Sequence, residues 1–181
     1  MIGSVGENQG IAKRDTCLCG FRVQSERHLL IDGHNVLHAW EDSRVLMRTS
    51  AESARAHVIS AGILIHDFEN IRVSIVFDGK GDEIGIEHPG RDAGCSVLYA
   101  PASMTADDLI EQMVGTSDRS QDFVVATGDR MERETVQALG AECVSPAFLE
   151  EWVVRCRDRQ SAAVIRRSRI QDQGWQNSLP L

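Results

Sequence analysis

IRVSIVFDG, residues 71–79, is the stretch that most clearly indicates the fold class of this chain. It is short, rich in β-branched residues and closed by Asp-Gly, which is the pattern of a strand buried on both faces of a parallel sheet. Residues 28–32, HLLID, have the same character and also stand before a glycine. Three more strands are predicted at CSVLYA (95–100), DFVVATGD (122–129) and AECV (141–144).

Helical patterns separate these strands. In residues 50–68, apolar residues recur every three or four positions, at Ala54, Val58, Ala61, Ile65 and Phe68, which predicts one buried helix face. The regular alternation of strand and helix predicts an α/β domain with a central parallel sheet of about five strands and helices on both faces.

Local signals predict where helices start. Thr49 with Glu52, and Thr105 with Asp108, have the spacing of capping boxes. Ser145-Pro146 combines an N-cap residue with a proline at the first helical position. The loop 79–94 is too long for a plain connection, and we expect it to be mobile near the working edge of the sheet.

The length of 181 residues fits one domain with tails. Residues 1–27 show no periodicity and are expected to form a flexible extension, 28–152 the folded domain, and 153–181 a basic C-terminal helix and tail. The net charge is -13 over 28–152 and +4 over 153–181. Such an acidic body repels polyanions, so any contact with nucleic acid must be local or bridged by metal.

Five scattered cysteines, an odd number, argue against a disulfide framework and for a reducing compartment. Two of them, Cys17 and Cys19, lack a second Cys or His pair nearby and are expected to be free thiols in the extension. No apolar run reaches the length of a signal peptide or a membrane span. A cytoplasmic location without membrane contact is expected.

Four acids stand at the ends of predicted strands or shortly after them, and one of these, Asp107, is at the start of the helix that follows the third strand. They are Asp32, Asp78, Asp107 and Asp129. Ligands of open parallel sheets bind at the carboxyl ends of the strands, so topology brings these acids to one rim. Converging carboxylates repel one another unless a cation neutralises them, and oxygen-only ligands suit Mg²⁺ or Mn²⁺. A hard divalent ion in such a rim favours phosphoryl chemistry.

Each acid alone also has a structural interpretation. Asp32 and Asp78 could form turns before glycine, Asp107 could be an acid favoured by the helix dipole, and Asp129 could be an N-cap with Glu132 completing a box. Asn35 could orient a water or a phosphate through its amide, or be the N-cap of the next helix. Because all four acids gather at one edge, the metal site is the favoured interpretation of the set.

Four motifs in order resemble the YacP-type NYN domains of the PIN-like nucleases: D-G-H-N at 32–35, I-V-F-D-G at 75–79, T-A-D-D-L-I-E at 105–111 and V-A-T-G-D-R at 125–130. The resemblance covers about residues 28–169. It implies a PIN-like three-layer α/β/α fold and metal-dependent RNA cleavage. It also implies that Asp32, Asp107 and Asp129 bind metal, that Asp78 is a further catalytic acid and that Asn35 is the amide beside the first aspartate.

The chain departs from this family pattern in two places. His34 stands where the family commonly has Tyr, and the loop after Asp78 carries only Lys80 and Arg91 as basic residues.

The expected function is that of an endoribonuclease, in which Mg²⁺ or Mn²⁺ activates water for in-line attack on phosphorus and leaves a 5′-phosphate. The substrate is expected to be RNA, such as mRNA or ribosome-associated RNA. The alternative is a non-catalytic RNA-binding or ribosome-associated module that uses the arginine-rich last helix. The sequence leaves the RNA target, the number of metal ions and the oligomeric state open.

Arginines of the last helix form a predicted substrate-binding stripe. At 100° per residue they fall within a sector of about 80°, and they are Arg155, Arg159, Arg166 and Arg169. Four guanidinium groups on one side could follow one phosphate strand. The alternative is a solvated basic face favoured by the helix dipole.

Overall fold

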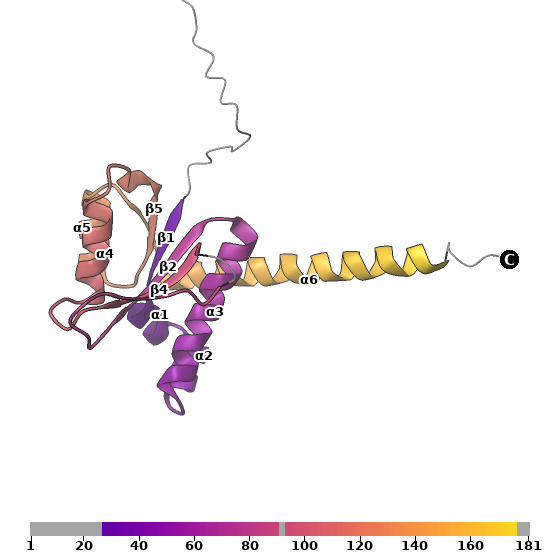
Figure 1. Ribbon diagram of the computed structural model, residues 1–181, viewed down its shortest axis with the longest axis horizontal. Coiled ribbons are helices and arrows are strands. Elements are labelled where there is room, and N and C mark those ends of the chain that lie inside the picture. The colour runs from indigo at the N-terminus through magenta and orange to yellow at the C-terminus, as the bar shows by residue number, and fades with distance from the viewer. Residues whose placement is uncertain (1–26, 91–92, 177–181) are drawn as a thin grey trace, which may run out of the picture.

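The computed structural model describes residues 27–90 and 93–176, without the side chains of residues 166–176. The predicted extension, including Cys17 and Cys19, therefore lies outside the described residues except for Arg27. Within the described part of the chain, the core is an α/β domain with one central sheet between two layers of helices (Figure 1).

The sheet has six strands in the order β3-β4-β2-β1-β5-β6. All neighbours pair in parallel except β3, which runs antiparallel to β4. Five of the strands are those that the sequence predicts. The strands are β1 (His28–Asp32), β2 (Arg72–Asp78), β3 (Gly85–Glu87), β4 (Cys95–Ala100), β5 (Phe123–Ala126) and β6 (Glu142–Val144).

The sixth strand, β3, lies inside the loop that the sequence predicts to be mobile. Its three residues pair with Tyr99, Leu98 and Val97 of β4. A three-residue strand is too short to show an alternating pattern, so only its pairing with β4 defines it. The prediction of a sheet of about five parallel strands is thus extended by one antiparallel edge strand.

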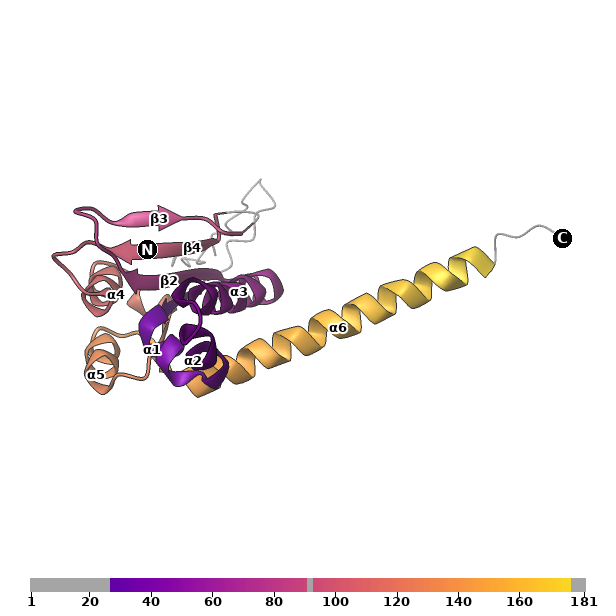
Figure 2. The ribbon, with the colours of Figure 1, turned by 90° about the horizontal axis from the view of Figure 1, so that it is seen from below.

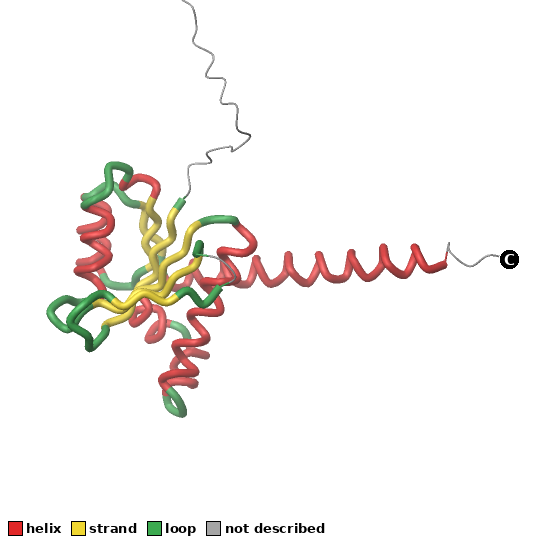
Figure 3. The backbone as a smooth tube through the Cα atoms, viewed as in Figure 1, coloured by secondary structure: helices red, strands yellow, loops and turns green. Residues whose placement is uncertain are grey.

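Six α-helices cover the sheet, together with a short 3₁₀ turn at Ser120–Asp122. Figures 2 and 3 show α4 and α5 on one side of the strands and α1, α2 and α3 on the other. The α-helices are α1 (Gly33–Ala39), α2 (Glu41–Met47), α3 (Ala51–Glu69), α4 (Ala106–Gly115), α5 (Arg130–Ala138) and α6 (Pro146–Gln176).

The predicted helix starts are confirmed in two of three cases. Thr105 and Asp108 form the complete capping box of α4, and the Ser145 hydroxyl accepts a hydrogen bond from the Phe148 amide at the start of α6. The start of α3 is one residue later than predicted, because the Ser50 side chain, not that of Thr49, accepts from the Ser53 amide. Serine and threonine are both common N-cap residues, so spacing alone cannot choose between neighbours.

Strand parity divides the core into two layers. Odd positions of β1, such as Leu29 and Ile31, pack in the layer with α1, α3 and α6, whereas Leu30 packs with α4 and α5. Successive side chains of a strand point to opposite faces, so Asp32 shares the α4/α5 face with Leu30. This parity places Asp32 on the same side of the sheet as α4, which carries Asp107, and α5, whose N-cap is Asp129.

Helix α6 begins on the body and then projects from it (Figure 2). Leu149, Val153 and Cys156 are buried among α1 and α3, whereas the side chains from Arg157 to Ile165 are exposed. The predicted division at residue 153 falls inside this helix. Among the described residues, no helix is long and apolar enough to cross a membrane.

Candidate active site

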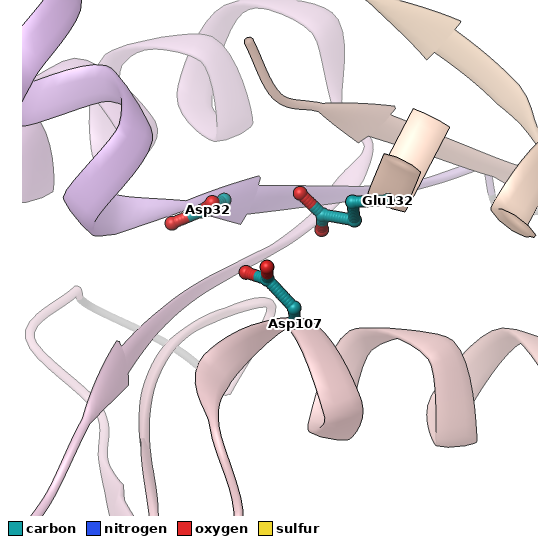
Figure 4. A group of neighbouring side chains, drawn as sticks. All are labelled: Asp32, Asp107 and Glu132. Atoms are coloured by element: carbon teal, nitrogen blue, oxygen red, sulfur yellow. The ribbon is translucent and has the colours of Figure 1, made fainter. Parts of the chain in front are cut away.

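Three carboxylates meet at the carboxyl edge of the sheet. Asp32 ends β1, Asp107 lies in the first turn of α4, and Glu132 lies in the first turn of α5. One carboxylate oxygen from each lies within 4.8 Å of the others, and Figure 4 shows the three side chains pointing toward one another. This group, the acidic triad, includes two of the predicted acids and one that the sequence assigned elsewhere.

Asp32 is held in place by hydrogen bonds at both oxygens. Its Oδ1 accepts from the Asn35 backbone amide at 3.1 Å, and its Oδ2 accepts from Asn35 Nδ2 at 2.6 Å. Asp32 is thereby the N-cap of α1, and the alternative that Asn35 caps this helix is wrong. Asn35 instead orients the carboxylate beside it.

Gly33 lets the Phe77 side chain pack closely against the start of α1. A Cβ at this position would overlap the Phe77 side chain of the neighbouring strand β2. The D-G pair at 32–33 therefore has a packing reason, since only glycine permits this close approach.

Glu132 is the least compensated member of the triad. It is 2 % exposed, and neither carboxylate oxygen has a hydrogen-bond partner among the described residues. Burial raises its pKa to about 8; the nearby Thr127 hydroxyl lowers the pKa, and the charges of the neighbouring aspartates raise it further. A buried acid without a partner is rare and costs stability, so it calls for a functional explanation.

Glu132 was not predicted as a site residue because its spacing from Asp129 fits a capping box. A second signal was present: Glu132 precedes Val136 by four residues, and both are buried on the same face of α5. An acid one turn before a core valine is expected to face the interior of the protein.

Asp107 is half-buried opposite Asp32. Burial raises its pKa to about 6, and the charges of Asp32, Asp129 and Asp78 act in the same direction. The charges of three other acids therefore act on the Asp107 carboxylate. Asp108, its neighbour, points away and completes the capping box, as predicted.

Asp78 lies at the rim but outside the acidic triad. Its Oδ1 accepts a hydrogen bond from the Ala106 amide at 2.7 Å, which fixes the start of α4 next to Asp107. His34 Nδ1 lies 3.1 Å from Asp78 Oδ2, so the histidine that replaces the family tyrosine contacts this acid.

Asp129 is exposed and caps α5. Its Oδ1 accepts from the amides of Met131 at 2.7 Å and Glu132 at 3.1 Å. The Thr127 hydroxyl accepts from the Asp129 amide, which gives Thr127 a structural role. The capping interpretation of Asp129 is confirmed, whereas direct metal binding by Asp129 stays a prediction.

Comparison with known proteins identifies a family that matches the region of the four motifs. A family model described as the YacP-like NYN domain matches residues 29–180. The chain belongs to the YacP-like NYN domain family. The resemblance seen in the four sequence motifs is thereby confirmed over nearly the whole described structure.

Similar proteins from Bacillus subtilis include one curated sequence and two crystal structures. The uncharacterized protein YacP of strain 168 is 29% identical over 114 residues, which cover 62% of this chain and 66% of the relative, just under two thirds of its length. The crystal structure of Rae1 (YacP) is 27% identical, covers 81% of this chain and 84% of that chain, and superposes with a TM-score of 0.67. The crystal structure of a mutant of the same Rae1 protein is 26% identical, with coverages of 78% and 83% and the same TM-score of 0.67.

Two of the four arginines in the predicted stripe have partners on the protein itself. Arg159 Nη1 lies 2.7 Å from Glu69 Oε1 at the end of α3. Arg155 lies over the Phe148 ring, with its guanidinium carbon 5.4 Å from the ring centre. The side chains of Arg166 and Arg169 lie outside the described residues.

The acidic triad fits a divalent metal ion. It offers only carboxylate oxygens, the ligands that Mg²⁺ and Mn²⁺ prefer. The two buried Glu132 oxygens without partners are what a cation would satisfy. A bound cation would also remove the repulsion that raises the pKa values of Asp107 and Glu132.

Proposed function

We propose that this NYN domain protein is a metal-dependent endoribonuclease that hydrolyses RNA phosphodiester bonds. The observation that carries the proposal is the acidic triad at the carboxyl edge of the sheet, with Glu132 buried and without a hydrogen-bond partner among the described residues. An arrangement that opposes its own folding in this way is best explained by a bound cation.

Asp32, Asp107 and Glu132 would hold Mg²⁺ or Mn²⁺, with Asp129, whose charge already acts on Asp107, as a further ligand. When bound, the ion would bind phosphate oxygens, lower the pKa of water and stabilise the charge that develops during hydrolysis. Asn35 keeps the Asp32 carboxylate oriented through two hydrogen bonds. Asp78 positions Asp107 by holding the first turn of α4.

RNA is the proposed substrate because membership of the NYN domain family implies it, and a metal in the acidic rim would bind the phosphate backbone. The domain of net charge -13 disfavours polyanions over most of its surface, so binding needs a local contact. We assign this contact to the metal and to the arginines of α6, of which Arg155 and Arg159 lie nearest the body.

The direct test compares two adjacent aspartates. Purified protein is incubated with a mixture of structured and unstructured RNAs in Mn²⁺ or in EDTA, and the product ends are mapped. We expect internal cleavage with 5′-phosphate ends in Mn²⁺, none in EDTA, and none by the Asp107→Asn variant. Asp108→Asn is the matched control, because Asp108 only caps α4, and it should retain most of the activity.

Cleavage by a folded Asp107→Asn protein at the wild-type rate would overturn the proposed site. RNA binding by the wild type without any metal-dependent cleavage would instead favour the non-catalytic module. Equal losses at Asp107 and Asp108 would mean that the two carboxylates do not have separate roles.

A further inference from the structure

A cavity lies on the α4/α5 face of the sheet, at the edge opposite the acidic triad. It has a volume of about 680 Å³ and is lined by residues from the starts of β1 and β2, from β3 and β4, and from α4. We call it the α4–β3 cleft. Helix α4 connects the two sites, because Asp107 lies in its first turn and Met113 near its end.

The floor of the α4–β3 cleft is polar although it lies within the sheet. His28 Nε2 and Ser74 Oγ are 2.9 Å apart, and Ser74 Oγ and Ser96 Oγ are 2.8 Å apart. All three residues are buried. The neighbouring positions on the same face, Leu30 and Val76, are core residues. This buried row of hydrogen-bonded side chains replaces apolar packing that would be expected if the floor only stabilised the fold.

The charge of the cleft is opposite to that of the body around it. Among the described residues that line it there is one arginine, Arg72, two histidines and no carboxylate. Burial and then the Arg72 charge lower the pKa of His28 to about 4, so His28 is neutral at pH 7 and Arg72 is the cation. Because none of the described lining residues is acidic, the Arg72 cation favours an anion in the cleft although the domain as a whole is negatively charged.

The walls of the cleft are apolar. Leu109 and Met113 of α4 line one side, and Ile84 and Ile86 at β3 line the other. Ile86 is 60 % exposed and Ile84 is 45 % exposed, although both belong to the face that looks into the cleft. Apolar walls with a few polar groups are the usual composition of small-molecule sites.

We propose that the α4–β3 cleft binds a small amphipathic anion, with its apolar chain or ring between β3 and α4 and its acidic head at Arg72. The Ser74–Ser96 hydroxyls supply further hydrogen bonds to the head. This site is separate from the acidic triad, so it does not depend on the proposed nuclease function.

The test uses 1-anilinonaphthalene-8-sulfonate, an aromatic sulfonate whose fluorescence rises in apolar surroundings, and decanoate as a competitor. We expect one site per chain, displacement by decanoate, and weak displacement by the cation decyltrimethylammonium. Arg72→Gln should weaken binding about tenfold or more, because it removes a charge-assisted contact. Arg44→Gln is the matched control, since Arg44 is an exposed arginine of α2 on the other face of the sheet.

A second variant tests the cavity without changing charge. Met113→Trp should fill the cleft and abolish binding while circular dichroism and thermal melting remain close to wild type, because Met113 is only partly buried. Asp107→Asn should bind the probe as the wild type does, which separates this site from the triad.

Three results for these variants and competitors would overturn the proposal. They are equal affinities of the wild type and both cleft variants, equal displacement by decanoate and the cationic amphiphile, and an equal loss in Arg44→Gln. A probe affinity that weakens as the chain dimerises in sedimentation experiments would also overturn it, and would make a second copy the occupant.

Discussion

Glu132 shows at the scale of one residue how a site opposes folding. In the folded protein its pKa is about 8, against an ordinary value of 4.5. The folded state therefore binds a proton more tightly than the unfolded state does. By linkage, Glu132 therefore destabilises the folded state at high pH. This loss of stability is absent below about pH 4.5, grows between pH 4.5 and 8, and is complete above pH 8. Asp107, with a pKa of about 6, acts in the same direction.

The first residue-scale prediction concerns Glu132→Gln in metal-free buffer with EDTA. The wild type should lose stability as the pH rises from 4.5 to 8, and the variant should lose much less. At pH 8 the variant should be the more stable by at most about 5 kcal/mol. Urea denaturation across this pH range measures the difference, and parallel curves for the two proteins would contradict the assigned burial of the charge.

The second residue-scale prediction concerns Gly33. Gly33→Ala places a methyl group against the Phe77 ring and should destabilise the fold by about 1 to 3 kcal/mol. Gly81→Ala is the control, because the nearest atom to its Cβ would be 3.6 Å away. Thermal melting of both variants tests the packing of the D-G pair, and equal melting temperatures would show that Phe77 moves aside at no cost.

At the scale of elements, the junction of α3 and α6 depends on one carboxylate. Glu69 Oε1 accepts hydrogen bonds from Arg159 Nη1 at 2.7 Å and from Trp152 Nε1 at 3.3 Å. Cys156 Sγ lies 3.9 Å from the same oxygen. These contacts come from three successive turns of α6, so Glu69 holds the root of the helix where it leaves the body.

We expect Glu69→Ala to loosen that root. Amide hydrogen exchange over residues 152–159 should become faster, and the fluorescence of Trp152 should change because its Nε1 loses an acceptor. Asp67→Ala, a change at an exposed acid of the same helix, is the control and should leave both signals unaltered. Unchanged exchange in Glu69→Ala would mean that the apolar contacts of Leu149 and Val153 suffice to hold α6.

At the scale of the whole molecule, charge is separated between an acidic body and a basic helix. The four arginines of the predicted stripe belong to α6. Two of them already have partners: Arg159 pairs with Glu69 of α3, and Arg155 lies over the Phe148 ring of α6 itself. Binding to RNA would therefore have to compete with these contacts. Arg166 and Arg169 lie farther along the same helix.

Replacing Arg155, Arg159, Arg166 and Arg169 with Gln should weaken RNA binding and flatten its salt dependence by up to about four phosphate contacts. Fluorescence anisotropy across a salt series measures the slope. The control changes the same charge elsewhere, at Arg44, Arg48, Arg55 and Arg119, and should leave the slope nearly unaltered. Equal slopes in the wild type and the stripe variant would show that these arginines form a solvated helix face and do not bind RNA.

Local sequence was enough to predict the five parallel strands, the capping box of α4 and the start of α6. These features rest on local physics: β-branched runs form buried strands, and Thr, Ser, Asp and Pro at set spacings start helices. Local sequence also identified the family, because the four motifs carry residues that the fold needs at the ends of its strands.

Which acids meet depends on tertiary packing. Asp78 and Asp129 look equivalent to Asp32 in the sequence, yet their oxygens accept hydrogen bonds from backbone amides at the starts of α4 and α5. Glu132 looks like part of a cap, yet the rotation of α5 against the sheet buries it beside Asp32 and Asp107. Sequence spacing fixes a residue's place along its own element, whereas the side chains that it faces depend on how separate elements pack.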